Sequence, residues 1–142
     1  MANIIYPRSP REVMDGWVHL PRYIDKILLL LAGKLSEEYL PNLGKNSDAL
    51  WLGAAGVTHE QMVEVVRGTI TDGEVCDWVR TNIFKSPAEK SAHRVAMLDF
   101  PPADDPDAQA FFAQRKAAYG MANREDITNR GDMLDADEGR IV

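Results

Sequence analysis

Three N-terminal helix signatures, spaced at helix-length intervals, constrain the fold of this chain more than any other feature. Each is a Ser or Thr followed three residues later by Gln or Glu, with apolar residues after it: Thr58 with Gln61, Thr71 with Glu74, and Ser86 with Glu89. In such a capping box, the two side chains satisfy backbone N–H groups that the first turn of a helix leaves unpaired. Because no segment of useful length alternates polar and apolar residues, the sequence predicts an all-α fold.

Proline and glycine mark the limits of the predicted helices in the first part of the chain. Ser9 and Pro10 are typical of a helix start, and Gly16 then keeps this first helix short. Pro21 begins a longer helix that ends at Gly33. The apolar run inside this helix shows no polar side, so other helices are expected to surround it.

The chain, residues 1–142, is expected to form a single helical domain, because this length suits one sizeable core and is short for two. Residues 1–100 are the predicted main body. After a proline-rich break, residues 101–142 supply a helix over 108–119 and an acidic C-terminal tail over 124–142, packed on the body or trailing from it. The expected architecture is a compact single-domain bundle of about six or seven short helices.

Charge and composition exclude several classes of protein. The chain has 22 acidic and 16 basic residues, and its net charge of −6 disfavours a nucleic-acid binder that depends on phosphate contacts. Its one cysteine cannot form an internal disulfide. No apolar run approaches the roughly 20 residues that span a bilayer, and no signal-peptide pattern is present. We therefore expect a cytoplasmic protein with neither nucleic acid nor membrane as a partner.

A cluster of polar side chains surrounds the start of the helix at Pro21. His19 comes just before this helix, and Arg22, Asp25 and Lys26 follow at positions i, i+3 and i+4, so that Asp25 and Lys26 both neighbour Arg22 on one face. Imidazole and carboxylate groups can exchange protons, whereas Arg and Lys hold carboxylates or phosphates. The cluster predicts a site for a small anionic molecule. In it, His19 and Asp25 are the catalytic candidates, and Arg22 and Lys26 bind the substrate.

Aromatic residues add to the predicted site. Tyr23 and Tyr39 can offer hydrogen bonds to a ligand, and Trp17 can form a wall of the pocket, so all three are substrate-binding candidates. Phe111 and Phe112 are expected to pack the C-terminal helix onto the body or onto a second copy of the chain. A homo-oligomer therefore stays open.

No metal or organic cofactor is predicted. His59 opens like a zinc-protease motif, but Val63 occupies the position of the required second histidine. Phosphate-loop and dinucleotide-binding glycine patterns are absent from the sequence. A metal site that joins His19 and Asp25 to a distant histidine is a minor alternative.

A dense stretch over residues 9–39 resembles a known family. The residues that carry the resemblance are Ser9-Pro10-Arg11, Gly16 to Lys26, Ala32-Gly33-Lys34-Leu35 and Tyr39. In their order and spacing they resemble the DUF5069 family of small bacterial proteins of uncharacterised function. Weaker similarity continues into the tail at Leu134-Asp135. The family has no established activity, so the resemblance implies a mainly helical fold.

Two kinds of function fit this sequence. One is a cofactor-free acid–base enzyme (a lyase, isomerase or hydrolase) in which His19 or Asp25 moves a proton while Arg22 and Lys26 stabilise negative charge. The other is a non-catalytic binding or regulatory module in which the cluster is structural, with an Arg22–Asp25 ion pair that locks the helix. A weaker third hypothesis is an interaction protein that acts through its acidic tail.

Overall fold

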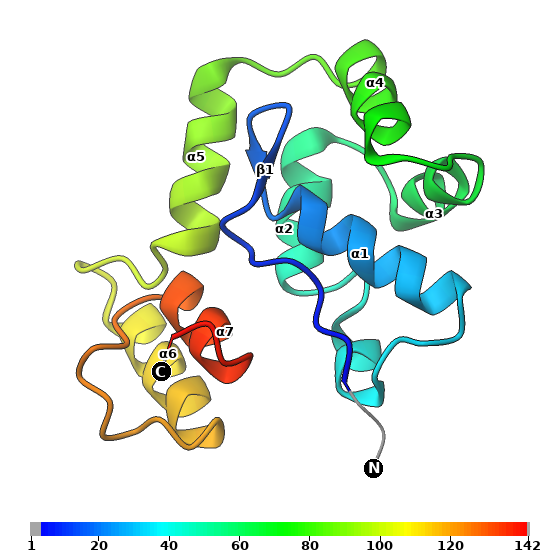
Figure 1. Cartoon of the computed structure of the whole chain (residues 1–142). Coiled ribbons are helices and arrows are strands. Elements are labelled where there is room, and N and C mark those ends of the chain that lie inside the picture. The colour runs from blue at the N-terminus through cyan, green and yellow to red at the C-terminus, as the bar shows by residue number, and fades with distance from the viewer. Residues whose placement is uncertain (1–3, 142) are drawn as a thin grey trace.

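The computed structural model describes residues 4–141, and within them the fold is mainly helical (Figure 1). The helices are α1 (Leu20–Leu31), the 3-10 helix η1 (Glu37–Asn42), α2 (Ser47–Ala55), α3 (His59–Arg67), α4 (Asp72–Asn82), α5 (Pro87–Leu98), α6 (Pro106–Ala118) and α7 (Arg130–Asp137). Two strands, β1 (Val13–Met14) and β2 (Trp17–Val18), form a small antiparallel pair. The predicted helical bundle is therefore confirmed. No helix in the described part of the chain is long and apolar enough to cross a bilayer.

All three predicted capping boxes are confirmed. Thr58, Thr71 and Ser86 are the N-caps of α3, α4 and α5, and each side chain accepts a hydrogen bond from the backbone N–H three residues later. The side-chain oxygen of the Gln or Glu at that third position accepts a hydrogen bond from the backbone N–H of the cap residue. Each of these helix starts is thus fixed by contacts within four residues.

The segment before α1 is a hairpin, and the short helix predicted there is wrong. Asp15 and Gly16 have φ values of 50° and 79° and form the two-residue turn between the strands. Positive φ at both central positions is the geometry that matches the twist of paired strands. Lys90 of α5 donates a hydrogen bond to the backbone oxygen of Asp15 at 2.6 Å, which holds the hairpin against α5.

The main core lies between the hairpin and α1 to α4. Its largest fully buried side chains include Trp17, Tyr23, Ile24 and Trp51. The Trp17 and Trp51 rings meet edge to face, with their centroids 6.0 Å apart. This geometry is favourable for aromatic pairs, and the two rings anchor β2 and α2 to each other.

The second half of α1 is exposed, so the prediction that other helices surround it is wrong. Ile27 is fully buried, whereas Leu28, Leu30 and Leu31 expose 42%, 36% and 40% of their surface. The reason is that α1 packs mainly against α3 and the hairpin, which cover one face of it.

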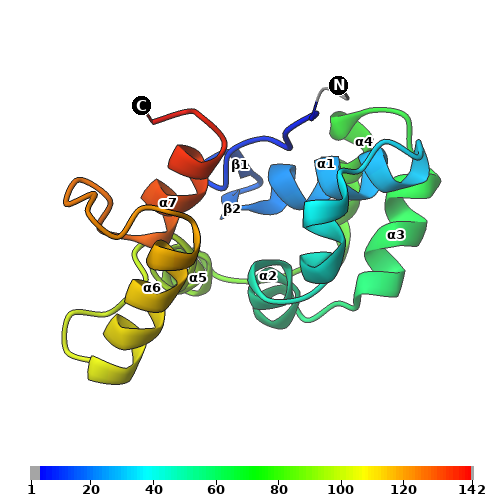
Figure 2. The same cartoon turned by 90° about the horizontal axis from the view of Figure 1, so that it is seen from below.

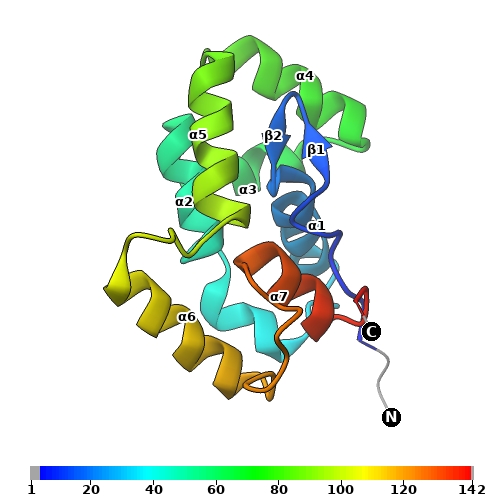
Figure 3. The ribbon, with the colours of Figure 1, turned by 90° about the vertical axis from the view of Figure 1, so that its left-hand side faces the viewer.

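Helices α6 and α7 lie together at one end of the molecule, below α5 and to one side of α1 to α4 (Figures 2 and 3). They have a small apolar cluster of their own, formed by Phe112, Met121, Ile127 and Met133. Part of the predicted acidic tail forms α7, which packs on α5. The tail is not a uniformly solvated segment, because Asp135 and Glu138 are buried. That the whole chain is one domain stays a prediction.

Candidate functional site

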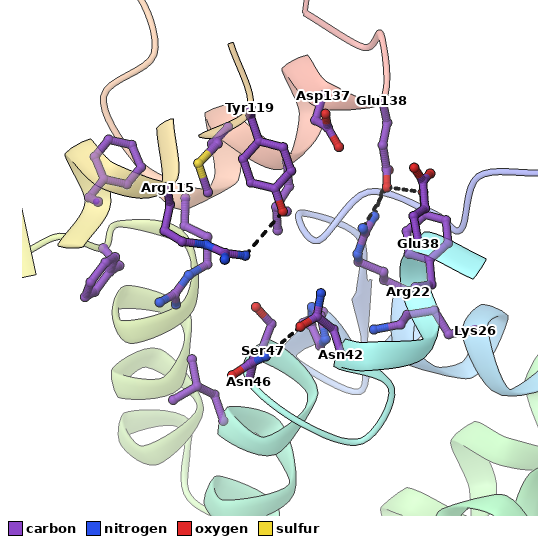
Figure 4. Close-up of a pocket in the computed structure, with 18 of the residues that line it drawn as sticks. Arg22, Lys26, Glu38, Asn42, Asn46, Ser47, Arg115, Tyr119, Asp137 and Glu138 are labelled. Carbon is purple, nitrogen blue, oxygen red and sulfur yellow. Dashed lines mark hydrogen bonds and ion pairs between the residues drawn. The ribbon is translucent and has the colours of Figure 1, made fainter. Parts of the chain in front are cut away.

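A cavity of about 530 Å³ lies between α1, η1 and α2 on one side and α6 and α7 on the other (Figure 4). This volume is in the range of small-molecule sites in proteins. The first side contributes mainly polar residues: His19, Arg22, Lys26, Glu38, Tyr39, Asn42, Asn46 and Ser47. The other side combines aromatic and apolar groups with Arg115, Arg130, Asp137 and Glu138.

Asp48, at the start of α2, is a fully buried carboxylate that joins two side chains of the cavity wall. Nε2 of His19 lies 2.7 Å from its Oδ1, and the Lys26 amine donates to its Oδ2 at 2.7 Å. The backbone N–H of Gly44 also donates to Oδ2, at 2.9 Å. Burial opposes ionisation of Asp48, yet the bonds from His19 and Lys26 hold its pKa below the ordinary value. The result is a buried network of one acid and two basic groups.

His19 presents an unpaired nitrogen within the fold. Burial lowers its pKa, and this outweighs the bond to Asp48, so the imidazole is neutral near pH 7. An ionised carboxylate can only accept, which places the proton on Nε2 and a lone pair on Nδ1. Nδ1 is buried and has no hydrogen-bond partner among the described residues. His19 as a whole lines the cavity, so the buried network beside the cavity contains one acceptor without a partner among these residues.

The backbone at His19 is strained. This residue precedes α1 with φ 72° and ψ −28°, in the left-handed region that side chains with a Cβ rarely adopt. Its N–H donates to the Pro10 carbonyl at 2.9 Å, which holds the chain in this conformation. Such a conformation costs about 1–3 kcal/mol, and strained residues of this kind cluster at functional sites.

Arg22 is already paired inside the protein. Its guanidinium donates two hydrogen bonds to Glu138, at 2.8 and 2.7 Å, and Tyr39 adds its hydroxyl at 2.6 Å. Arg140 also pairs with Glu138. Burial opposes ionisation of Glu138, but the bonds from Arg22 and Tyr39 hold its pKa below the ordinary value. The positive charge of Arg22 is therefore balanced by a carboxylate of the protein itself.

Two other arginines of the cavity have no carboxylate partner among the described residues. Arg115 of α6 reaches the hydroxyl of Tyr119 at 3.4 Å, and Figure 4 shows both side chains at the edge of the cavity. Arg130 donates to the carbonyls of Ala96 and Met97 at 2.9 and 3.2 Å. Burial lowers the pKa of Arg130, so its charge is only partly compensated by these neutral acceptors.

Four of the seven residues predicted for the site line the cavity: His19, Arg22, Lys26 and Tyr39. They come together because three lie on the cavity-facing side of the α1 start and η1 brings Tyr39 beside them. This short 3-10 helix lies in the segment that joins α1 to α2.

Asp25 does not line the cavity. It accepts hydrogen bonds from the backbone and guanidinium of Arg8, at 2.9 to 3.0 Å, and Arg8 also bonds Asp72. Successive residues of a helix point about 100° apart, so Asp25 diverges from Lys26 even though both neighbour Arg22. The predicted Arg22–Asp25 ion pair is replaced by the Arg22–Glu138 and Arg8–Asp25 pairs.

Trp17 and Tyr23 also lie away from the cavity. Trp17 is fully buried and packs on Trp51 and on the ring of His93. The Tyr23 hydroxyl lies 2.5 Å from Nδ1 of His59, at the junction of α1 and α3. Both aromatic residues therefore belong to the core that supports α1.

Sequence reasoning missed four residues of the site: Asp48, Arg115, Arg130 and Glu138. Asp48 follows Ser47 in the first turn of α2, where an acid ordinarily serves as a cap. Glu138 belongs to a run of acids that is typical of a solvated tail. No local pattern distinguishes Asp48 or Glu138, because their partners His19 and Arg22 lie 29 and 116 positions away in the sequence.

Comparison with known proteins adds one match. A family model described as "Domain of unknown function (DUF5069)" matches residues 4–140. The match extends the resemblance seen over residues 9–39 to nearly the whole chain and confirms it. The search of curated proteins found no match to this chain. Among the described residues, no group of three or more His, Cys, Asp or Glu side chains is placed to hold a metal ion.

Proposed function

The chain belongs to the DUF5069 family, and we propose that it binds a small organic anion in the cavity between α1 and the C-terminal helices. One observation carries the proposal: Arg115 and Arg130 line the cavity without a carboxylate partner among the described residues. A guanidinium can hold a carboxylate or phosphate through two parallel hydrogen bonds. The two side chains thus supply positive charge in a protein whose net charge is −6.

The aromatic wall of the cavity supports a ligand with a flat apolar part. Five aromatic residues line it: Tyr39, Phe100, Phe111, Phe112 and Tyr119. Phe111 exposes 52% of its surface, so a ligand that covers it removes apolar area from water. We therefore propose an aromatic or similarly flat carboxylate or phosphate as the ligand class.

Calorimetric titration with benzoate, phenyl phosphate, citrate and neutral benzamide tests this proposal. We expect the two aromatic anions to bind more tightly than citrate, and benzamide to bind weakly. The Arg115→Gln variant should bind the anions at least about tenfold more weakly, since a hydrogen bond to a charged group contributes about 1.5–3 kcal/mol. Arg94→Gln is the matched control, because Arg94 is exposed on α5 and does not line the cavity.

Two results would overturn the anion site. One is benzamide binding as tightly as benzoate. The other is equal anion affinity in the Arg115→Gln, Arg94→Gln and unmodified proteins.

A specific observation favours a second function, acid–base catalysis on the bound anion. Nδ1 of His19 has no hydrogen-bond partner in the part of the chain that the structure describes, while Nε2 donates to Asp48. A proton taken up at Nδ1 makes an imidazolium whose charge Asp48 stabilises, as a carboxylate does for a histidine base. In this proposal His19 is the base, Asp48 positions it, and Lys26 stabilises developing negative charge.

Proton exchange tests the catalytic proposal. The α-hydrogens of phenylpyruvate should exchange with D₂O, as followed by proton NMR, about 10²-fold or more faster with the unmodified protein than with His19→Asn. Asn tolerates a left-handed backbone, so this variant keeps the strained turn. His59→Asn is the control. Equal exchange rates in the His19→Asn and unmodified proteins would contradict the assignment of His19 as the base.

A further inference from the structure

We infer that the cavity acts on 2-oxo acids through a covalent imine at Lys26. This inference rests on the proposed anion site and adds a reactive carbonyl to its ligand. Among the described residues that line the cavity, Lys26 is the single lysine. Its side chain is only 4% exposed, and its amine contacts Asp48 at 2.7 Å. Figure 4 shows the Lys26 side chain among the residues that line the cavity.

The surroundings of Lys26 differ from those of a surface lysine. Burial lowers its pKa, and nearby Arg22 lowers it further, whereas Asp48 opposes both effects. A desolvated lysine is more readily deprotonated and is a better nucleophile toward carbonyl carbon. Lys34, just beyond the end of α1, is exposed and has no such environment.

Imine formation preserves the charge balance of the buried network. The Lys26 ammonium gives a proton to Asp48 or a water, and its nitrogen attacks the carbonyl carbon of the oxo acid. The carbonyl oxygen takes up two protons and leaves as water, while a C=N⁺ bond forms. One ammonium and one carbonyl thus become one iminium and one water, with no change in charge. Asp48, fully buried, therefore has a cationic neighbour both before the reaction and once the iminium has formed.

The neighbours of Lys26 suit the next step. His19 and Lys26 bond the two oxygens of the same Asp48 carboxylate. We assign His19, which lines the same cavity, as the base that takes the proton from the carbon beside the iminium. The electrons of that C–H bond then form a C=C bond, and the C=N⁺ electrons return to nitrogen to give a neutral enamine. The carboxylate of the oxo acid, bonded to the carbon that Lys26 attacks, lies in the cavity that Arg115 and Arg130 also line.

Reductive trapping tests the inference on the unmodified full chain. The protein is incubated with pyruvate or phenylpyruvate, treated with sodium borohydride and measured by intact mass spectrometry and peptide mapping. We expect one adduct per chain, with the mass of the acid less water plus two hydrogens, on the peptide that contains Lys26. Absence of the adduct from Lys26, or equal labelling of exposed lysines, would overturn the imine.

Variants separate this inference from the proposed function. Lys26→Arg keeps a cation beside Asp48 but cannot form an imine, so it should lose the adduct, whereas the control Lys34→Arg should keep it. Arg115→Gln should slow labelling at least about tenfold through weaker anion binding. If benzoate still binds through Arg115 while Lys26 stays unlabelled, the imine is wrong and the anion site stands. If Lys26 is labelled and Arg115→Gln changes neither benzoate binding nor labelling, the anion site at Arg115 is wrong and the imine stands.

Discussion

Arg22 and Glu138, 116 residues apart in the chain, form a buried two-bond ion pair with distances of 2.8 and 2.7 Å. Their side chains are 5% and 2% exposed. The pair ties the start of α1 to the residue that ends α7, and Tyr39 joins it through its hydroxyl. Because all three residues line the cavity, this contact determines how the two sides of the cavity are held together.

Removing the charge of Glu138 should therefore destabilise the protein. We expect Glu138→Gln to lower the free energy of unfolding by about 3–5 kcal/mol, since Arg22 would be left buried without its counter-charge. Urea unfolding measures the change. Glu37→Gln is the matched control, because Glu37 is an exposed glutamate on η1, and it should unfold like the unmodified protein. Equal urea midpoints for Glu138→Gln and Glu37→Gln would show that the Arg22–Glu138 pair contributes nothing to stability.

Asp25 should be dispensable for ligand binding. Its carboxylate faces Arg8 and not the cavity, so Asp25→Asn should leave benzoate affinity unchanged. Stability should fall by about 1–3 kcal/mol from weakened charge-assisted hydrogen bonds. Calorimetric titration and urea unfolding of the same sample measure both effects. If Asp25→Asn lowers the benzoate affinity as much as Arg115→Gln does, Asp25 is part of the binding site.

Acid should destabilise the fold through buried histidines. Burial, together with the neighbouring His19, lowers the pKa of His93 from 6.5 to about 4. Between these two pH values the unfolded chain binds a proton that the folded chain does not. Stability is therefore unaffected above pH 6.5 and falls as pH drops toward 4, by on the order of 3 kcal/mol. The lowered pKa of His19 acts in the same direction.

His93→Gln checks this pH dependence. His93 packs on Trp17 and shares a surface groove with Lys85 and Glu89, which remain in the variant. The free energy of unfolding, measured by urea at several pH values from 4 to 7, should fall less steeply with acid in His93→Gln than in the unmodified protein. Parallel curves for the two proteins would contradict a titrating role for His93.

The small apolar cluster of α6 and α7 should unfold together with the main body. Ile127, which is 1% exposed, lies in that cluster, and Ile127→Ala should cost about 2–5 kcal/mol. The three tryptophans all belong to the main body, so their fluorescence reports on it alone. For Ile127→Ala, we expect tryptophan fluorescence and amide exchange in α6 and α7 to report the same decrease in the free energy of unfolding. Free exchange in α7 with unchanged tryptophan fluorescence would show two separate domains.

The sequence predicted well what depends on neighbouring residues. Thr58, Thr71 and Ser86 determine the starts of three helices through contacts within four positions, and all three starts are confirmed. The hairpin turn at Asp15-Gly16 was missed because the Ser9-Pro10 pair resembles a helix start. Local patterns compete here, and the packing of Lys90 against the turn favours the hairpin.

The candidate site was predictable only in its α1 part. His19, Arg22 and Lys26 lie at the start of the same helix, so their spacing in the sequence predicts that they are neighbours. Asp48 and Glu138 come from distant segments and depend on tertiary packing that no periodicity reveals. The exposed leucines of α1 were misread for the same reason, because an apolar run does not say how many neighbours a helix has.

A crystal structure of the protein with 4-bromobenzoate is the decisive test of the anion site, because anomalous scattering from bromine locates the ligand without ambiguity. We expect a bromine peak inside the cavity, among Tyr39, Phe111 and Tyr119, with the carboxylate at the guanidinium of Arg115 or Arg130. Bromine peaks confined to the outer surface, in crystals grown at a concentration that saturates binding in solution, would contradict it.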